Sequence, residues 1–232
     1  MDLLKRIAVG TANWGQKYNG SQIDKEEIRD ILDYCTCCGI DMLDTAEEYG
    51  SEEIVGRLAN SSFDIVTKGN GNIESSLKSL ERDQIYGYLW RTPVTFGGSH
   101  RMLQAEHTGL SLYDAPPEGS KWGMRPGIIQ VPYSLMDRRF EHLISYWCKD
   151  QIEVHVRSIF LRGKCLEKAT PQECIKFVLC NPFIDRVVMG IDSLAQLKEN
   201  VEFIHKWNSM QCSDENIIDP RCWRKSDEKE IL

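Results

Sequence analysis

The 232-residue chain has a formal net charge of −7 at pH 7, with 41% hydrophobic and 27% charged residues. This acidic balance argues against general binding to nucleic acids or membrane surfaces, because both need a concentrated positive field. No stretch approaches the roughly 18–20 apolar residues of a membrane span. The first ten residues lack the apolar core of an export signal. We therefore expect a single-domain cytoplasmic protein.

The nine cysteines are odd in number and irregular in spacing, which does not fit a disulfide framework. Cys35, Cys37 and Cys38 stand close together, but no paired Cys-x-x-Cys or nearby histidine completes four metal ligands. Cys35 and Cys38 instead extend the apolar face of a predicted helix. We expect reduced structural thiols and no metal site.

Short apolar runs alternate with amphipathic stretches, which predicts parallel strands joined by helical crossovers. The first helix has the clearest ends, with Asp24 as N-cap, Glu27 at the capping-box position and Gly39 as its stop. Ser193 and Gln196 form a similar start for the last helix. Strands are predicted at 6–11, 40–45, 63–68, 85–90, 107–113, 128–133, 152–160 and 186–191, and helices at 21–39, 51–59, 73–81, 140–149, 170–179 and 193–207.

Eight strand units is the number that closes a parallel barrel. Between the fourth and fifth strands only residues 100–106 could be helical, so that crossover is predicted to be shortened. An open doubly wound sheet is the alternative, but it ordinarily carries G-x-G-x-x-G after the first strand, and the glycines of 10–20 lack that spacing. We predict a (β/α)8 TIM barrel over 1–210, with a tail at 211–232 that packs on the barrel.

Ionisable side chains stand at the ends of consecutive predicted strands. Asp44 ends the second strand, Tyr49 follows it in the loop, Lys68 ends the third strand and Arg91 follows the fourth. Parallel barrels carry their functional residues at the carboxyl ends of the strands, so these four groups are expected to converge. A phenol, with an ordinary pKa of about 10, is a useful acid at neutral pH only when a cation stabilises its ionised form. Lys68 suits that task, and Asp44 would balance the lysine charge.

At these residues the chain resembles a known family. GIDMLDTAEEYGSEEIVG at 39–56 resembles the aldo-keto reductase signature, in which Asp and Tyr stand at these relative positions, and VTK at 66–68 matches the lysine strand. The resemblance continues through 128–140, 152–163 and 187–200. It implies an eight-stranded barrel that reduces a small aldehyde or ketone with NADPH. In that reaction Tyr49 would be the general acid, with Lys68 and Asp44 as its tuning pair.

The fourth catalytic position departs from the family pattern. The family usually has histidine just after the fourth strand, whereas this chain has Arg91. Arginine can hydrogen-bond a carbonyl oxygen and is always charged, but it cannot act as a neutral imidazole. Two interpretations stay open: a working variant of the site, or a barrel that binds nucleotide with little or no turnover, as a sensor or accessory protein. A cofactor-free or metal-dependent isomerase is weaker, since carboxylates and histidines show no metal spacing.

The resemblance also implies a cofactor site for NADPH, with NADH as an alternative. Gln130 and Ser111 would hold the nicotinamide amide, although Leu112 replaces the usual asparagine, and the Arg157 guanidinium would stack where the family often has an aromatic ring. Residues 158, 161 and 163 would form the pyrophosphate loop. The complete predicted set is Gly10, Thr11, Ser111, Gln130, Arg157, Ser158, Leu161, Gly163, Gly190, Asp192, Gln196 and Asn200.

The adenosine end of this predicted site has lost its basic residues. Asp192 and Gln196 stand where the family binds the 2′-phosphate, while Asn200 is retained. A carboxylate beside a phosphate dianion is unfavourable, which leaves the choice between NADPH and NADH open unless Lys198 or Lys164 reaches the phosphate. At the other end, Trp14 follows the first strand, where it could line a substrate pocket or pack against the tail.

Overall fold

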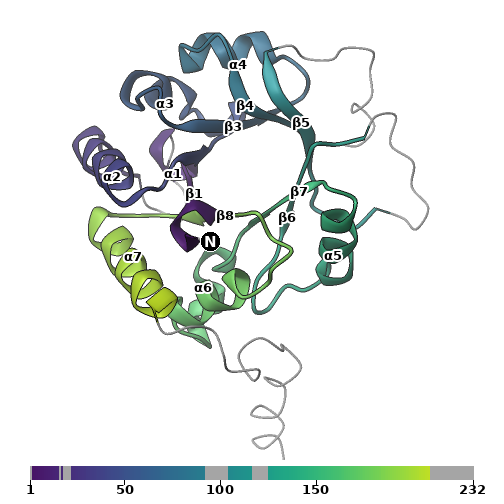
Figure 1. The fold of residues 1–232 in the computed structure, drawn as a ribbon. Helices are drawn as coiled ribbons and strands as arrows, with labels where there is room; N and C mark the ends of the chain where they lie inside the picture. The colour runs from purple at the N-terminus through teal and green to yellow at the C-terminus, as the bar shows by residue number, and fades with distance from the viewer. Residues whose placement is uncertain (1, 16, 18–21, 92–103, 117–124, 210–232) are drawn as a thin grey trace, which may run out of the picture.

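A computed structural model describes residues 2–15, 17, 22–91, 104–116 and 125–209. Within these residues, eight parallel strands pair in chain order and the last pairs with the first, so the sheet closes into a barrel. This confirms the predicted (β/α)8 TIM barrel, seen end-on in Figure 1. The strands are β1 Ile7–Gly10, β2 Met42–Asp44, β3 Asp64–Gly69, β4 Ile85–Trp90, β5 Ala105–Ser111, β6 Ile128–Pro132, β7 Glu153–Arg157 and β8 Arg186–Gly190.

The longer helices lie around the outside of the barrel (Figure 1). The α-helices are α1 Ala12–Gly15, α2 Lys25–Cys38, α3 Glu52–Leu58, α4 Ile73–Leu80, α5 Glu141–Lys149, α6 Pro171–Leu179 and α7 Leu194–Ser209. Three short 3-10 helices complete the described elements: η1 Leu3–Arg6, η2 Glu47–Tyr49 and η3 Leu161–Glu167. No helix in the described ranges has both the length and the apolar character needed to cross a bilayer.

Two hydrophobic clusters fill the interior. The larger lies between the strands and the helices, and the smaller is built from one residue of each of six strands: Ala8, Met42, Val66, Leu89, Ile128 and Val188. Side chains alternate along a strand, so the inner cluster shares its face of the sheet with the positions two residues on. Those positions are Gly10, Asp44, Lys68, Arg91, Gln130 and Gly190. The strand pattern therefore places a polar layer directly above an apolar plug.

The first and last units of the barrel are joined by side-chain hydrogen bonds across β1 and β8. The Arg6 guanidinium donates to the carbonyl oxygens of Leu179, Asn181 and Ile184 at 2.7–2.8 Å. The Glu27 carboxylate accepts from the Leu194 amide at 2.5 Å, which ties α2 to α7. We call these contacts the seam.

The capping box predicted for α2 is only half present. The Asp24 side chain accepts from the amides of Glu26 and Glu27, as expected of an N-cap. The Glu27 carboxylate, however, accepts from Leu194 at the seam. A tertiary donor has replaced the local one, which no local sequence pattern reveals.

The connection between β4 and β5 differs from the expected one in its second half. Residues 105–106, predicted at the end of a short helix, already belong to β5. Residues 92–103 and the predicted tail at 211–232 lie outside the described residues, so the length of this crossover and the position of the tail stay predictions. The described cysteines are free thiols, and burial raises the pKa of Cys35 and Cys174 to about 12.

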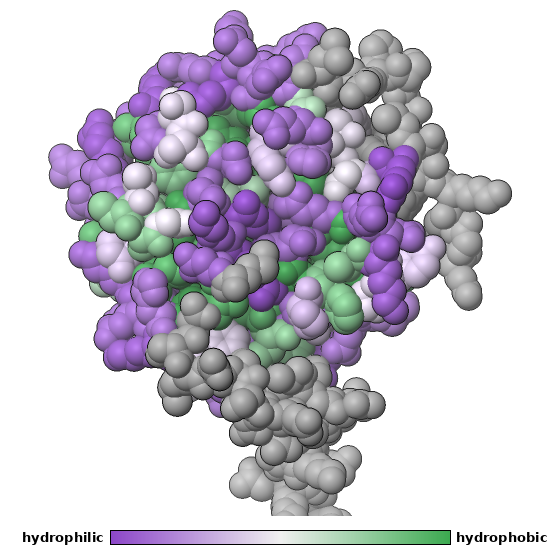
Figure 2. Space-filling view, viewed as in Figure 1, coloured by the Kyte–Doolittle hydropathy of each residue, from purple (hydrophilic) through white to green (hydrophobic). Residues whose placement is uncertain are grey.

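A second polar cluster occupies the amino ends of the strands. Glu153, the first residue of β7, accepts hydrogen bonds from Tyr86 at 2.7 Å and from the buried His155 at 2.8 Å. Burial disfavours ionisation of Glu153, but the contacts with His155 and Tyr86 outweigh burial and lower its pKa to about 2. Burial raises the pKa of nearby Asp185. Hydrophilic side chains gather over the middle of the face that carries η1 in Figure 2.

Candidate active site

A buried ion pair lies at the centre of the carboxyl ends of the strands. The Lys68 ammonium donates to Asp44 Oδ1 at 2.5 Å and to the Thr45 carbonyl oxygen at 2.7 Å. The two side chains of the pair are 0% and 4% exposed. Lys68 is the last residue but one of β3 and Asp44 ends β2, so the parallel pairing of these two strands brings them together. The convergence of these two residues predicted from the sequence is present.

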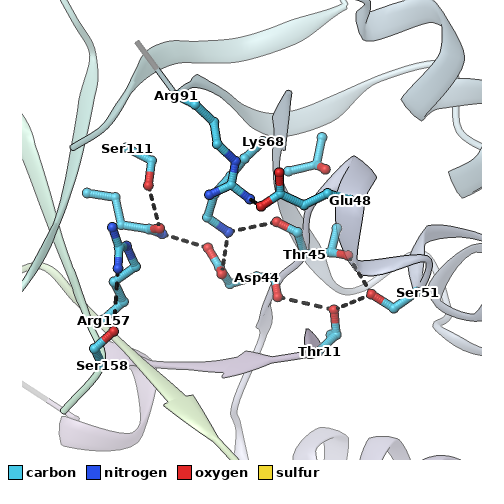
Figure 3. A network of polar contacts seen from close by, with 12 residues as sticks. Thr11, Asp44, Thr45, Glu48, Ser51, Lys68, Arg91, Ser111, Arg157 and Ser158 are labelled. Atoms are coloured by element: carbon cyan, nitrogen blue, oxygen red, sulfur yellow. Dashed lines mark hydrogen bonds and ion pairs between the residues drawn. The ribbon is translucent and has the colours of Figure 1, made fainter. Parts of the chain in front are cut away.

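Gln130 and Ser111 extend this pair across the barrel (Figure 3). The Gln130 amide donates to Asp44 Oδ2 at 2.6 Å, and the Ser111 hydroxyl donates to Gln130 Oε1 at 3.3 Å. All three side chains are buried. Both carboxylate oxygens of Asp44 are therefore occupied, one by Lys68 and one by Gln130.

Tyr49 lies beside the ion pair, at the end of η2. Its ring centroid is 5.3 Å from Lys68 Nζ and 5.8 Å from Arg91 Cζ. Gly50 ends η2 in the left-handed conformation with φ 65°, which glycine adopts without strain. The tyrosine is thus held in a turn between two cations and borders the open space above the barrel.

The backbone around Tyr49 is fixed by a close approach of α1. A Cβ atom on Gly15 would lie only 2.2 Å from the Gly50 carbonyl carbon and 2.4 Å from the Tyr49 oxygen. No other residue fits at position 15 without moving η2. Gly15 therefore sets the position of Tyr49 through backbone contact.

Buried hydroxyl groups support the strand end that carries Asp44. The Ser51 hydroxyl is 2.9 Å from that of Thr11 and 3.0 Å from that of Thr45. Thr11 also donates its amide to the Asp44 carbonyl oxygen at 3.0 Å. Thr11, a predicted cofactor residue, thus braces the site within the core.

Arg91 approaches Tyr49 from the end of β4. Its guanidinium forms an ion pair with Glu48 and donates to the Tyr113 hydroxyl at 3.4 Å. The Arg91 side chain is 13% exposed, whereas that of Glu48 is 59% exposed. The position predicted for Arg91 beside the tyrosine is therefore present, with a carboxylate partner that the sequence motif did not indicate.

A pocket of about 900 Å³ opens above this polar layer. Of the predicted site residues, it is lined by Gly10, Asp44, Tyr49, Arg157, Ser158, Leu161, Gly163, Gly190, Asp192 and Gln196. The remaining predicted residues, Thr11, Trp14, Lys68, Arg91, Ser111, Gln130 and Asn200, do not belong to its wall. Lys68, Ser111 and Gln130 lie beneath the wall because their polar groups bind one another and Asp44.

Trp14 and Asn200 lie in the protein interior. The Trp14 side chain is 0% exposed and packs in the larger hydrophobic cluster, so the substrate contact considered for it has no support from its position. Asn200 is 4% exposed, and its amide lies 3.3 Å from Met189 Sδ. Their positions on α1 and α7 direct both side chains into the interior, and a motif comparison does not predict this direction.

The segment after β7 has an uncommon backbone. Ser158, Leu161 and Arg162 have φ values of 60°, 47° and 55°, and Gly163 has φ 88°. Left-handed conformations at non-glycine residues are uncommon and tend to cluster at functional sites. Phe160, which lies between Ser158 and Leu161, is right-handed, and alternation of the two hands produces concavities in which backbone amides bind anions. This segment borders the pocket.

Several polar residues of the wall escaped the sequence analysis. Tyr113 lies between two guanidinium groups, since it also packs 4.3 Å from Arg157 Cζ. Asp137 and Arg139 form an ion pair on the rim, in which hydrogen bonds from Arg139 lower the pKa of Asp137. Glu48 stands inside the recognised motif and could have been found as a pocket group from its place beside Tyr49. Tyr113 follows β5, and Asp137 and Arg139 follow β6 within the stretch 128–140, where the resemblance did not assign them to the site.

The comparisons with known proteins agree with this architecture. Residues 6–87 match the sequence model of the aldo/keto reductase family. This segment carries Asp44, Tyr49 and Lys68, so the resemblance to the family that the motifs indicate is confirmed for the part of the chain that holds these three residues. No curated protein sequence matches the chain.

Solved structures extend the likeness to the whole barrel. A protein from Pseudomonas aeruginosa described as an aldo-keto reductase has 22% identity and a TM-score of 0.73, over 87% of this chain and 90% of that one. The holo form of the aldo-keto reductase AKR11C1 from Bacillus halodurans has 19% identity and a TM-score of 0.66, over 86% of each chain. The thermostable aldo-keto reductase Tm1743, solved with the inhibitor epalrestat, has 20% identity and a TM-score of 0.72, over 91% and 92%. At such identities the likeness shows the fold.

Proposed function

We propose that this protein is an NAD(P)H-dependent oxidoreductase that reduces a small aldehyde or ketone to an alcohol, with Tyr49 as the general acid. The observation that carries the proposal is the Tyr49 ring on the pocket wall, 5.3 Å from a lysine ammonium that is buried against Asp44. A cation held close to a phenol stabilises the phenolate that remains after proton transfer. Asp44 balances the charge of that buried ammonium.

The residues present fit a nicotinamide dinucleotide. The pocket volume of about 900 Å³ lies within the range of roughly 300–1,000 Å³ for ligand sites. Arg157 and Arg162 line it together with the left-handed segment 161–163, a set suited to phosphate groups. Gly10 and Gly190 leave room beside Asp44 because they carry no side chain.

When bound, the reduced nicotinamide supplies the hydride. The residues of the chain perform the other tasks. Tyr49 holds at its hydroxyl oxygen the proton that the carbonyl oxygen takes up, and Lys68 stabilises the phenolate left behind. Gln130 and Ser111 hold Asp44 in one orientation through the hydrogen bonds at 2.6 and 3.3 Å. Arg91 adds a second positive charge next to the developing oxyanion.

The choice between NADPH and NADH rests on Asp192. Its carboxylate lines the pocket and is held by the Asn13 amide at 2.8 Å. Near a 2′-phosphate this charge would be repulsive, whereas near a ribose hydroxyl it would accept a hydrogen bond. Separate titrations with the two cofactors decide between them.

A second candidate function is a nucleotide-binding barrel with little or no turnover. It is favoured by the ion pair of Arg91 with Glu48, which leaves the position of the usual histidine occupied by a charged and already bound group. Arginine cannot supply a neutral imidazole at that position.

One experiment separates the two. The purified protein is titrated with NADPH and NADH by fluorescence, and a panel of aldehydes and ketones is then screened by loss of nicotinamide absorbance. Binding and turnover support the reductase. Binding with no turnover across a broad panel supports the second candidate, and binding of neither cofactor contradicts both.

Tyr49→Phe is the sharpest variant. It removes only the proton donor, so we expect kcat to fall about 10²–10⁴-fold with nucleotide affinity nearly unchanged. Tyr146→Phe, at a tyrosine that is 61% exposed on α5, is the matched control and should retain full activity. Persistent reduction by Tyr49→Phe would show that the acid is misassigned.

A further inference from the structure

On the basis of the proposed function, we infer that the preferred substrates carry a carboxylate next to the reacting carbonyl, as 2-oxo acids do, and that this carboxylate replaces Glu48 on Arg91. The first observation is the charge balance beside Tyr49. Lys68 is fully paired with the buried Asp44. Arg91 is the other cation near the tyrosine ring, at 5.8 Å, and its carboxylate partner is the half-exposed Glu48.

The two ends of the Arg91–Glu48 pair differ in their surroundings. The Arg91 side chain is 13% exposed and follows the buried strand β4, while the Glu48 side chain is 59% exposed and lines the pocket. A solvent-exposed carboxylate gains little from such a pair, since exposed ion pairs contribute only about 0–1 kcal/mol. The arginine is therefore fixed, and its present partner is replaceable.

Tyr113 and Arg157, which line the pocket beside Glu48, add to the positive field around Arg91. The Tyr113 hydroxyl accepts from Arg91 at 3.4 Å, and its ring lies 4.3 Å from Arg157 Cζ. Arg157 donates to the Leu112 carbonyl oxygen and the Ser158 hydroxyl, which are both uncharged. Tyr113 thus lies between two guanidinium groups, and Glu48 is paired with one of them, so these four side chains carry an excess of positive charge.

The geometry suits one substrate class. Arginine binds carboxylates through two parallel hydrogen bonds, which fixes the orientation of the bound anion. A carboxylate seated on Arg91 would bring an adjacent carbonyl towards Tyr49. The carbonyl carbon then gains the hydride of the reduced nicotinamide, which is oxidised, and the carbonyl oxygen gains the Tyr49 proton, giving a 2-hydroxy acid. The phenolate recovers its proton from water.

The test compares phenylglyoxylate with its methyl ester, which has the same ring and ketone without the charge. We expect kcat/KM for the acid to exceed that for the ester at least tenfold in the unaltered protein. Arg91→Gln should remove this preference. Glu48→Gln should lower KM for the acid about two- to fivefold relative to KM for the ester, because it removes a carboxylate that competes for Arg91. Arg57→Gln, at a surface arginine paired with Glu53, makes the same charge change as Arg91→Gln. It should alter neither the preference for the acid nor the KM values.

The outcomes separate this inference from the proposed function. Equal use of acid and ester, with Arg91→Gln slowing both alike, would overturn the inference and leave the reductase standing. If no substrate oxidises the nicotinamide, the reductase fails, and calorimetry with phenylglyoxylate decides the inference. Binding that is tightened by Glu48→Gln and lost in Arg91→Gln supports it, and absence of saturable binding contradicts it. Glu48→Gln keeps the test informative if Arg91→Gln does not fold.

Discussion

The two ends of the barrel interior carry polar clusters of similar construction. At the carboxyl ends, Asp44 is bound by Lys68 and Gln130. At the amino ends, Glu153 is bound by His155 and Tyr86. Each cluster surrounds one carboxylate with a cationic or titratable group and a neutral donor, and the apolar plug of the inner cluster separates the two.

The difference between them is access. Asp44 borders the pocket, and Tyr49 stands over its lysine. Neither Glu153 nor His155 belongs to that pocket wall. Parallel barrels place reactive groups at the carboxyl face and stabilising groups at the amino face. The same hydrogen-bond chemistry should therefore support activity at one end and only stability at the other.

Lys68→Met should disrupt the cluster at the carboxyl ends of the strands, and we expect it to have the largest effect on stability and activity. Removing one partner of a buried ion pair leaves an uncompensated carboxylate, which costs about 3–5 kcal/mol of unfolding free energy. Reduction should also fall by at least about 10²-fold because the phenolate loses its cation. Urea unfolding and nicotinamide absorbance measure the two effects.

A double variant separates charge balance from chemistry. Adding Asp44→Asn to Lys68→Met removes the orphan charge, so stability should partly return while activity stays lost. Lys206→Met is the control, since its pair with Glu202 is exposed on α7 and contributes little to stability. Full activity in Lys68→Met would contradict the role assigned to the lysine.

Glu153→Gln should disrupt the cluster at the amino ends of the strands without changing the rate of reduction. The folded-state pKa of Glu153, about 2, lies below its ordinary value of 4.5. Ionised Glu153 therefore adds up to about 3 kcal/mol to the free energy of unfolding above pH 4.5. This contribution is lost as the pH falls towards 2. Unfolding free energies measured between pH 5 and pH 2.5 should fall less steeply in the variant, with kcat at neutral pH unchanged. A large loss of kcat in a folded variant would contradict the division between the two ends.

Of these three sites, Gly15→Ala should give the smallest change in stability. It tests whether the backbone contact of Gly15 positions Tyr49. The added methyl group would meet the Tyr49–Gly50 backbone at 2.2–2.4 Å, so η2 must shift, at a cost of about 1–3 kcal/mol. We expect kcat to fall more than nucleotide affinity. Gly39→Ala is the control, because nothing lies within 4 Å of that Cβ and its φ of +86° costs about 1 kcal/mol without reaching the site. Equal kcat values in the two variants would show that Tyr49 does not depend on this contact.

The sequence predicted the barrel because each buried strand carries its own apolar run and turn signals. It also predicted the approach of Asp44, Lys68 and Arg91, since parallel pairing aligns strand ends. Contacts formed between distant side chains were not accessible in this way. Glu27 binds Leu194 in place of its own helix start, and Gln130 binds Asp44 from the opposite side of the barrel.

The weaker site predictions share a physical cause. Trp14 and Asn200 were placed by their position after a strand or within a motif, but burial decided the direction of both side chains. Glu48 and Tyr113 both contact Arg91, a residue that departs from the family pattern. A substituted residue selects new partners, and a motif built from the usual residue cannot name them.

The seam has a consequence for folding during synthesis on the ribosome. Arg6 and Glu27 find their acceptors and donors 167 to 178 residues later in the chain. A ribosome must therefore release nearly the whole barrel before its first strand acquires a second neighbour. Until then β1 has one open edge, and bringing such distant segments together is the slow, entropically opposed part of folding. The N-terminal strand is synthesised first but completes its pairing last. We therefore expect this end of the nascent chain to depend on chaperones for the longest time.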